Sequence, residues 1–247
     1  MKDCMIYCAG KTPASRYAKQ QLFQSGLSIS DAPCWNTNHL LLDVPSFQPG
    51  LWSEEELDTL LSSLPRDLII WGGNLCHEKL SNYRTVDLLT DESYLTDNAA
   101  LTADCVIPLA ESALKQPWER SSVLLIGWGR ITKALSGKLR SLNAHVSIAS
   151  GTPHHHKDAA AAGFPVLASS CLENSIRNFH LIINTAPAPV LTLKEPCPTV
   201  LMDLASVKGI DASDVIWARA LPGKYAPECS GKLIADAVIR QIREVSP

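Results

Sequence analysis

The sequence predicts an α/β protein with two domains, each built on a parallel sheet. Short apolar runs of strand type alternate with helical segments along the whole chain, which is typical of proteins wound from βα units. The chain has 247 residues, whereas one domain typically has roughly 100–200. A composition of 46% hydrophobic and 19% charged residues can build buried cores, and it excludes a disordered chain or a charge-rich coiled coil.

The first part of the chain contains the elements of a small α/β domain. A helix is expected at 14–24 after the turn Gly10-Lys11-Thr12, which is not a P-loop because Met5 stands where that motif needs glycine. A second helix begins after Ser53, since Ser53 and Glu56 can form a capping box. Strands are expected at 4–8, 40–44, 67–71 and 85–89. These elements predict a flavodoxin-like domain over residues 1–96 that binds substrate or acts as a lid.

The second part, residues 97–247, is expected to be a larger nucleotide-binding domain. It begins with a hinge helix at 97–114, which Pro108 should kink or end early because proline lacks the amide hydrogen. It ends with an amphipathic helix at 228–244. Between them, strands are expected at 122–126, 144–149, 165–168, 181–184, 199–203 and 215–218.

The turn after the strand at 122–126 is the most informative segment. The strand leads into Gly127-Trp128-Gly129 and then directly into a helix, which predicts the start of a Rossmann-type dinucleotide-binding unit. The first glycine permits the tight turn, and the second lets the backbone approach a pyrophosphate at the helix N-terminus. Thr132 replaces the usual third glycine, so a looser contact between helix and strand is expected. The expected cofactor-binding residues of this turn are Gly127, Trp128, Gly129, Arg130 and Ile131.

The segment after the next strand indicates which nicotinamide cofactor is bound. An NAD-selective site usually places Asp or Glu there to bond the ribose 2′-hydroxyl. This chain has the acid-free run Ala149–Lys157, with hydroxyls at Ser150 and Thr152, three histidines and a lysine that could accept a 2′-phosphate. The sequence therefore favours NADP, with NAD as the alternative, and adds Ser150 and Thr152 to the cofactor site. Three consecutive histidines project in different directions, so we expect a solvated loop there and no metal site.

Polar and glycine-containing segments follow several of the later strands. In an open parallel sheet, ligands bind beyond the carboxyl ends of the strands. These segments are therefore expected to line the nicotinamide side of the site, with Asn98 and Thr102 of the hinge helix facing them. The expected cofactor-binding residues are Asn184, Thr185, Ala186, Pro187, Ala205 and Ser206, and the expected substrate-binding residues are Asn98, Thr102, Pro222, Gly223 and Lys224.

Several of these residues have a purely structural alternative. Asn184 and Asp203 could cap turns, and Pro222-Gly223 could shape a loop. Lys224 is the most attractive cation for a substrate carboxylate. The catalytic residues stay open, with Asp104, Lys224 and Tyr225 as candidates and His180 as a further possible base.

Four segments taken together resemble the A subunit of dipicolinate synthase, a family of sporulation enzymes that make pyridine-2,6-dicarboxylate. They are Asn98–Asp104, Ile183–Ala188, Asp203–Ser206 and Leu221–Pro227, and the resemblance runs from about Asp87 to the end of the chain. It implies a two-domain oxidoreductase related in architecture to formate and 2-hydroxyacid dehydrogenases. It further implies oxidation of a dihydrodipicolinate-type precursor to dipicolinate, with NAD(P) as cofactor and a flavoprotein-like B subunit as partner.

The chain departs from that family at two motifs. The family follows its Asp-Leu-Ala-Ser segment with Arg-Pro-Gly-Gly, where this chain has Val207–Ile210, and it has Glu-Gly where this chain has Asp104-Cys105. A diverged paralogue therefore stays open. A 2-hydroxyacid dehydrogenase-like enzyme would need a late histidine beside an arginine and an acid. The segment from Asp203 onward contains arginines but no histidine, which argues against this alternative. A non-catalytic nucleotide-binding regulatory or scaffold protein is the remaining alternative, and the missing third glycine favours it.

Charge and hydropathy bear on partners and location. The net charge of −3, with no basic block, argues against nucleic acid. The apolar runs are far shorter than the roughly 20 residues that cross a bilayer, and the start Met1–Cys4 is not typical of a signal peptide. Eight scattered cysteines suit a reducing compartment. We expect a cytoplasmic homo-oligomer that binds a small dicarboxylate.

Overall fold

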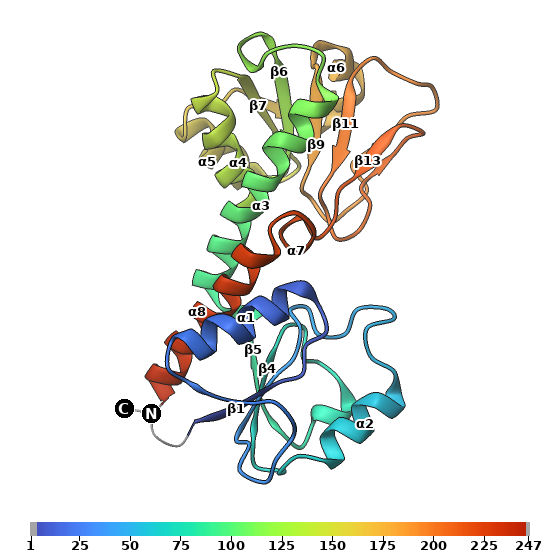
Figure 1. Cartoon of the computed structure of the whole chain (residues 1–247). Coiled ribbons are helices and arrows are strands. Elements are labelled where there is room, and N and C mark those ends of the chain that lie inside the picture. Colours follow the sequence, from blue (N-terminus) through green and yellow to red (C-terminus); the bar gives the residue numbers. More distant parts are fainter. Residues whose placement is uncertain (1–3, 246–247) are drawn as a thin grey trace. The chain divides into compact units, whose positions relative to one another are not determined.

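A computed structural model describes residues 4–245. The expectation that the chain lacks a signal peptide partly rests on Met1–Cys4, and most of that segment lies outside the described residues. The chain forms two compact units (Figure 1). The first contains the residues up to Asn98 together with those from Pro222 onward, and the second contains Ala99–Leu221. The C-terminal helix therefore belongs to the first unit, whereas the sequence placed it in the nucleotide domain. Within the described residues, no helix is long and apolar enough to span a membrane.

The first unit is built on a five-stranded parallel sheet in the order β2-β1-β3-β4-β5, which is the flavodoxin-like order. Four of the strands follow the predicted ones closely. The fifth, β2, was missed because Ser28-Ile29-Ser30 contains a single apolar residue. The strands are β1 (Met5–Cys8), β2 (Ser28–Ser30), β3 (His39–Leu41), β4 (Ile69–Gly72) and β5 (Arg84–Asp87).

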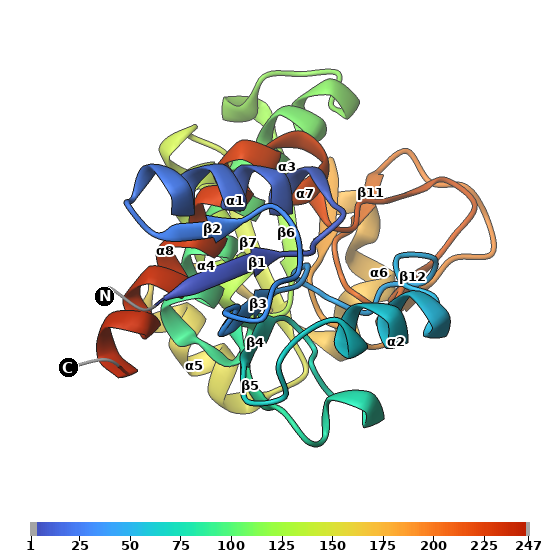
Figure 2. The same cartoon turned by 60° about the horizontal axis from the view of Figure 1, so that its bottom comes forward.

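Helices cover both faces of this sheet. On one face α1 (Pro13–Gln24) lies beside α8 (Pro227–Val245), as both views show (Figures 1 and 2). Both helices pack on buried Ile6 and Trp71 of the strands. On the other face α2 (Glu54–Ser62) buries its leucines, including Leu57, against β3 and β4. The packing of α8 on α1 explains why the C-terminal segment belongs to this unit.

Gly231 sets the close approach of α8 to α1. A Cβ atom at Gly231 would lie 2.5 Å from the carbonyl oxygen of Ala14 and 2.8 Å from the amide nitrogen of Ala18. We expect Gly231→Ala to lower the free energy of unfolding by about 2 kcal/mol, because backbone atoms cannot yield as a side chain can. Urea denaturation measures it. The control is Gly137→Ala, at a helical glycine with no described atom within 4 Å of its Cβ position, which should gain up to about 1 kcal/mol. Equal stability of the two variants would contradict the expected clash.

In the turn after β1, the amides that could bind an anion are already bound by the carboxylate of Asp43. Buried Asp43 follows β3, and its carboxylate oxygens accept hydrogen bonds from the amides of Lys11 (3.0 Å) and Thr12 (2.9 Å) and from the Ser15 hydroxyl (2.6 Å). The N-terminus of α1 is thus neutralised internally. This agrees with the rejection of a P-loop at Gly10-Lys11-Thr12.

The hinge helix begins earlier than expected and continues through its proline. Helix α3 runs from Glu92 to Ala113 with Pro108 inside it, so Pro108 does not end it. It begins earlier because the Asp91 carboxylate accepts hydrogen bonds from the amides of Ser93 (2.9 Å) and Tyr94 (3.1 Å). Asp91 also binds Arg240 and Gln241 of α8, each at 2.6 Å. Asp91 therefore links the start of α3 to α8 inside the first unit.

This link should depend on pH. Burial acts to raise the pKa of Asp91, but its hydrogen bonds to Gln241 and Arg240 outweigh burial and hold the pKa below the ordinary value of 3.8. The ionised form is thus favoured in the folded state, so its stabilisation is present above about pH 4 and is lost as the pH falls through the lowered pKa. Asparagine also caps helices, so we expect Asp91→Asn to cost about 1–2 kcal/mol at pH 7 through the lost charge-assisted bond with Arg240. Urea titrations from pH 7 to 3 should show this difference shrinking below pH 4, and a pH-independent difference would contradict it.

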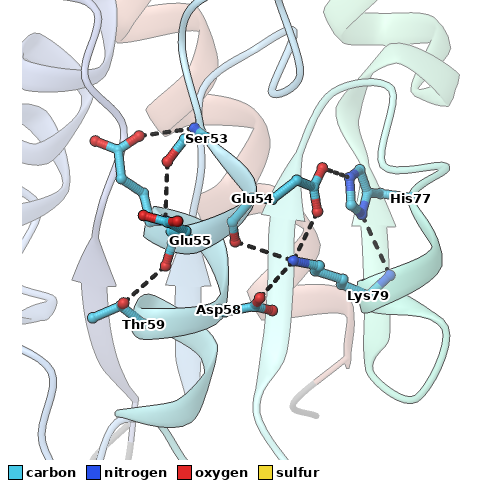
Figure 3. Close-up of polar contacts among 8 residues, drawn as sticks. Ser53, Glu54, Glu55, Asp58, Thr59, His77 and Lys79 are labelled. Atoms are coloured by element: carbon cyan, nitrogen blue, oxygen red, sulfur yellow. Dashed lines mark hydrogen bonds and ion pairs between the residues drawn. The ribbon is translucent and has the colours of Figure 1, made fainter.

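A surface cluster joins α2 to the short helix η1 (Glu78–Leu80) (Figure 3). The Lys79 amine lies 2.7 Å from the Glu54 carboxylate and 2.8 Å from the Asp58 carboxylate, and it donates to the Glu54 carbonyl oxygen at 3.0 Å. The hydrogen bond from Lys79 lowers the pKa of Glu54, and the bond to Asp58 raises the pKa of Lys79. His77 adds a 3.5 Å contact to Glu54. The predicted capping box of Ser53 and Glu56 is present at the start of α2.

The second unit is built on a six-stranded parallel sheet in the order β13-β11-β9-β6-β7-β8. Counted from β6 as the first strand, this is the Rossmann order 3-2-1-4-5-6. The central strands β6 and β9 are apolar and buried along almost their whole length, as expected for a sheet covered on both faces. The strands are β6 (Ser122–Ile126), β7 (His145–Ser150), β8 (Val166–Ala168), β9 (Leu181–Asn184), β11 (Val200–Asp203) and β13 (Val215–Trp217).

Helices and short segments complete the second unit. The helix after β6 is α4 (Arg130–Ser141), and the helix after β7 is α5 (Pro153–Ala161). The three histidines lie in the first turns of α5, so the expected solvated loop is wrong there, because Pro153 is suited to the first helical position. The other elements of this unit are β10 (Leu191–Thr192) paired with β12 (Ile210–Asp211), α6 (Leu172–Ser175), η3 (Trp118–Arg120), η4 (Ser169–Cys171) and η5 (Ile176–Asn178). The first unit also contains η2 (Leu88–Thr90) and, from Pro222 onward, α7 (Leu221–Tyr225).

Candidate dinucleotide-binding site

The first glycine of the turn is required by its backbone and its neighbours. Gly127 has a φ of 101°, in the left-handed region that favours glycine. A Cβ atom there would lie 2.7 Å from the Thr185 hydroxyl oxygen and 3.4 Å from the Ala186 amide nitrogen. The Gly127 amide donates to the Ala149 carbonyl oxygen at 2.8 Å. The turn is therefore held between the ends of β7 and β9.

The second glycine leaves the start of α4 open. Gly129 is exposed and caps the helix, and apart from Gly129 and its two chain neighbours no described heavy atom lies within 4 Å of the position its Cβ would take. The first amides of a helix have no acceptor within the helix, and the positive end of its dipole attracts anions. Arg130 and Ile131 form the first helical positions. An open backbone at the N-terminus of a 12-residue helix fits a pyrophosphate group.

Thr132, at the position of the third glycine, strengthens the turn. Its buried hydroxyl lies 2.7 Å from the Thr185 hydroxyl, which itself donates to the Ile126 carbonyl oxygen at 3.0 Å. This chain of hydroxyls joins α4 to the ends of β6 and β9. The expected looser contact is therefore wrong, because two hydroxyl groups replace the close packing that glycine allows.

Trp128 belongs to the core of the unit and can offer a ligand only its backbone. Its side chain is 5% exposed and packs edge-on against Phe164, with ring centroids 5.7 Å apart. The indole nitrogen has no hydrogen-bond partner within the described part of the chain. The sequence expectation for Trp128 thus applies to its main chain.

The end of β7 carries hydroxyl and imidazole groups. The buried Ser150 hydroxyl accepts from the Thr152 amide at 3.2 Å and lies 3.3 Å from Nδ1 of His155. His156 bonds the Ser150 carbonyl oxygen through Nε2. Thr152 caps α5 without a side-chain hydrogen bond to any described amide. Ser150 and Thr152 therefore lie together beside the start of a nine-residue helix with no acid in its first turn.

The predicted residues after β9 and β11 form one buried network. The Asn184 amide group donates to the Ala186 carbonyl oxygen and to the Asp203 carboxylate, both at 3.0 Å, and its oxygen accepts from the Ala186 amide at 3.0 Å. Asp203 accepts from the amides of Gly209 (2.7 Å) and Ile210 (2.8 Å) as well. These contacts agree with the structural alternative, in which Asn184 and Asp203 hold turns of the protein.

This network positions the loops that carry the other candidates. Asp203 also accepts from the Ala205 amide at 3.0 Å, which leaves Ala205 buried and Ser206 exposed at the carboxyl end of β11. Asn184 sets the turn that carries Thr185, Ala186 and Pro187 after β9. The glycine turn, Thr185–Pro187 and Ser206 therefore follow neighbouring strands at the same edge of the sheet. Sequence reasoning missed the role of Thr132, for which a hydroxyl at the third glycine position was the available signal.

Two possible bases lie at the opposite edge of the sheet. Asp104 is 2.6 Å from the Lys138 amine in the last turn of α4, and α4 runs from the carboxyl ends of the strands back to their amino ends. His180 precedes β9, and its Nδ1 accepts from the Ser122 amide at 3.0 Å. Neither side chain is placed with the cofactor candidates of the second unit, because each belongs to the amino-terminal edge.

The expected substrate residues are divided between the units. Thr102 is a buried residue of α3 in the second unit, and Asn98 belongs to the first. Pro222 and Gly223 also belong to the first unit, in the short helix α7 instead of the expected loop. Lys224 and Tyr225 are the exposed last residues of α7.

The second unit has the parallel order, the glycine turn and the open helix start of a Rossmann-type nicotinamide-binding domain, as in the NAD(P)-dependent dehydrogenases. No family model matches the chain. In sequence, it is similar to the dipicolinate synthase A subunit of Bacillus subtilis (strain 168), with 23% identity over 174 residues, or 66% of this chain. The match spans 59% of the length of that curated relative.

Solved structures share the fold over nearly the whole chain. The dipicolinate synthase A subunit from Bacillus halodurans superposes with a TM-score of 0.80 at 18% identity and covers 97% of both chains. The A chain of dipicolinate synthase from Bacillus subtilis gives 0.78 at 18% identity, over 99% of this chain and 97% of that one. A transhydrogenase from Sinorhizobium meliloti gives 0.70 at 13% identity, over 98% and 94%. The resemblance to the dipicolinate synthase A subunit and the two-domain Rossmann-type α/β fold are both confirmed.

Proposed function

We propose that this chain binds NADP(H) and is an oxidoreductase of the type of the dipicolinate synthase A subunit. In this proposal it oxidises a dihydrodipicolinate-type precursor to dipicolinate together with a flavoprotein-like B subunit. The observation that carries the proposal is the open glycine turn at Gly129, located where the strand order reverses between β6 and β9. The fold shared with the two dipicolinate synthase structures supports the substrate class.

The chemistry sets what the protein must supply. Oxidation of a dihydropyridine dicarboxylate to the aromatic ring removes one hydride, which a bound nicotinamide would accept, and one proton, which a base would accept. The substrate also needs cations or amides for two carboxylates. We propose Lys224 as one such cation and Tyr225 as the candidate base. Asp104 is a weaker candidate because Lys138 already holds its carboxylate.

The choice of NADP rests on the end of β7. A carboxylate there would bond a ribose 2′-hydroxyl and repel a 2′-phosphate. This chain instead places the Ser150 hydroxyl, His155 and the start of α5 there, and the cap residue Thr152 makes no side-chain hydrogen bond to the helix amides described. A 2′-phosphate is attracted by such a helix start and can accept hydrogen bonds from hydroxyl and imidazole groups.

A charge change at this position should reverse the preference. We expect Ser150→Asp to weaken NADPH binding by about 10- to 100-fold and to leave NADH binding unchanged or tighter, since like charges repel at short range. Calorimetric titration with both cofactors measures the ratio. Ser141→Asp, at the exposed end of α4, is the control for added charge. If wild-type protein binds both cofactors equally, the preference for NADP is wrong.

The whole reaction is tested with the purified chain. Mixing it with NADP, a flavoprotein-like B subunit and enzymatically generated dihydrodipicolinate should produce the ultraviolet absorbance of dipicolinate. Cofactor binding without product under all these conditions would instead assign the chain to the non-catalytic, nucleotide-binding alternative. We further propose a reducing compartment and a homo-oligomeric state; the eight free cysteines, of which Cys76, Cys171 and Cys229 are exposed, support the first of these.

A further inference from the structure

The edge strand β13 of the second unit ends on an exposed aromatic residue, Trp217, and the side chain of Arg219 lies over its ring. The Trp217 side chain is 47% exposed, which is unusual for so large an apolar group. The guanidinium carbon of Arg219 lies 5.1 Å from the centre of the Trp217 ring, within the range of a cation–π contact. Arg219 is exposed and forms no ion pair with any other residue between 4 and 245. Its charge is therefore available to a ligand.

This pair is fixed at the carboxyl end of the sheet. The Trp217 indole nitrogen donates to the Ala205 carbonyl oxygen at 3.3 Å, and the Ala218 amide donates to the Asp203 carbonyl oxygen at 2.8 Å. The pair thus belongs to the same network that positions exposed Ser206. Ala220 follows with a φ of 54°, a left-handed conformation that is costly for a residue with a Cβ atom. Such strain is typical of functional segments and fixes the chain direction directly after Arg219.

The position relative to the cofactor indicates which ligand comes here. The glycine turn opens the first half of the Rossmann sheet, so the second half, β9-β11-β13, takes the other mononucleotide. The reacting nicotinamide and the substrate belong on that side. We infer that Arg219, whose guanidinium lies over the Trp217 ring, is a binding residue for a carboxylate of the substrate. This inference rests on the proposed function and names a binding residue that sequence reasoning did not.

The chemistry of the pair suits a carboxylate better than other ligands. A cation–π contact with the Trp217 ring uses none of the guanidinium N–H groups as hydrogen-bond donors to an acceptor atom, and these groups can match a carboxylate through two parallel hydrogen bonds. The contact with the ring also restricts the Arg219 side chain before binding, so less rotamer entropy is lost. An apolar docking partner would leave the Arg219 charge unpaired.

The test is binding of stable carboxylates to the full chain in the presence of saturating NADP. Calorimetry would compare pyridine-2,6-dicarboxylate, benzoate, pyruvate and the neutral pyridine-2,6-dicarboxamide, for wild type, Arg219→Gln, Arg219→Lys and the control Arg177→Gln, an exposed arginine of η5. We expect Arg219→Gln to weaken dicarboxylate binding by about 10- to 100-fold. Arg219→Lys should recover only part of the loss, because an amine lacks the planar fork.

The NADP affinity separates a binding role from a folding defect. It should stay within about twofold of wild type in every Arg219 variant, and Trp217→Ala should weaken dicarboxylate binding in the same direction by a smaller factor. Unchanged dicarboxylate affinity in Arg219→Gln would overturn the inference and leave the proposed function standing. Arg219-dependent binding of benzoate or pyruvate alone would keep the carboxylate site and overturn the proposed substrate. No binding of any carboxylate by the wild type would overturn the inference.

Discussion

Gly129→Asp is expected to weaken NADPH binding by about 100- to 1000-fold and to change the free energy of unfolding by less than about 1 kcal/mol. The two effects separate because of the local geometry. The space around the Cβ position of Gly129 is open, so a side chain can leave the backbone there without an immediate clash. In the proposed site that same space receives the pyrophosphate at the start of α4, so a carboxylate there would place like charges a few ångströms apart.

Fluorescence or calorimetric titration with NADPH measures the loss, and urea denaturation measures the stability. Two matched variants isolate the cause. Gly129→Ala adds a methyl group without charge and should cost less than about tenfold in affinity. Gly137→Asp adds the same charge at another open glycine of α4 and should leave NADPH affinity unchanged. An unaltered affinity in Gly129→Asp would refute the site, whereas equal losses at Gly129 and Gly137 would point to a damaged helix.

The parts of the fold that were predictable are those whose signal is local. The strands at 122–126 and 181–184 agree to the residue, because uninterrupted apolar runs buried on both faces are typical of central parallel strands. The glycine turn between strand and helix is equally local. In contrast, β2 has one apolar residue, and its place at the sheet edge depends on pairing with β1. Its sequence alone carries almost no strand signal.

The features that were not predictable depend on contacts between distant residues. The residues next to Asp91 in the sequence do not predict that Arg240 and Gln241 will bind it. These contacts form where the last helix packs within the first unit. The same holds for the hydroxyl pair of Thr132 and Thr185, which lie 53 positions apart in the chain. Asn184 shows the converse case. A polar residue after a strand can bind ligand or hold a turn, and only its partners decide between them.

Asp203→Ala is expected to lower the free energy of unfolding by about 4 kcal/mol, a larger loss than at Gly231 or Asp91. The fully buried carboxylate accepts four hydrogen bonds, and its removal leaves their donors without a partner and away from water. The donors are the amides of Ala205, Gly209 and Ile210 and the side-chain amide of Asn184. Asp203→Asn keeps the shape but replaces one carboxylate oxygen by an amide NH2 group that faces N–H donors, so it should lower the free energy of unfolding by about half as much.

Urea denaturation measures both variants, with Asp211→Ala as the control because Asp211 is exposed at the end of β12, directly after Ile210. The control should stay within about 0.5 kcal/mol of wild type. Since Asp203 also holds the segment that carries Ser206, and its carbonyl oxygen anchors the chain before Arg219, Asp203→Asn should weaken NADPH binding as well. A variant that loses cofactor affinity but no stability would make Asp203 a ligand-binding residue, and a variant that keeps both would show that the buried network is dispensable.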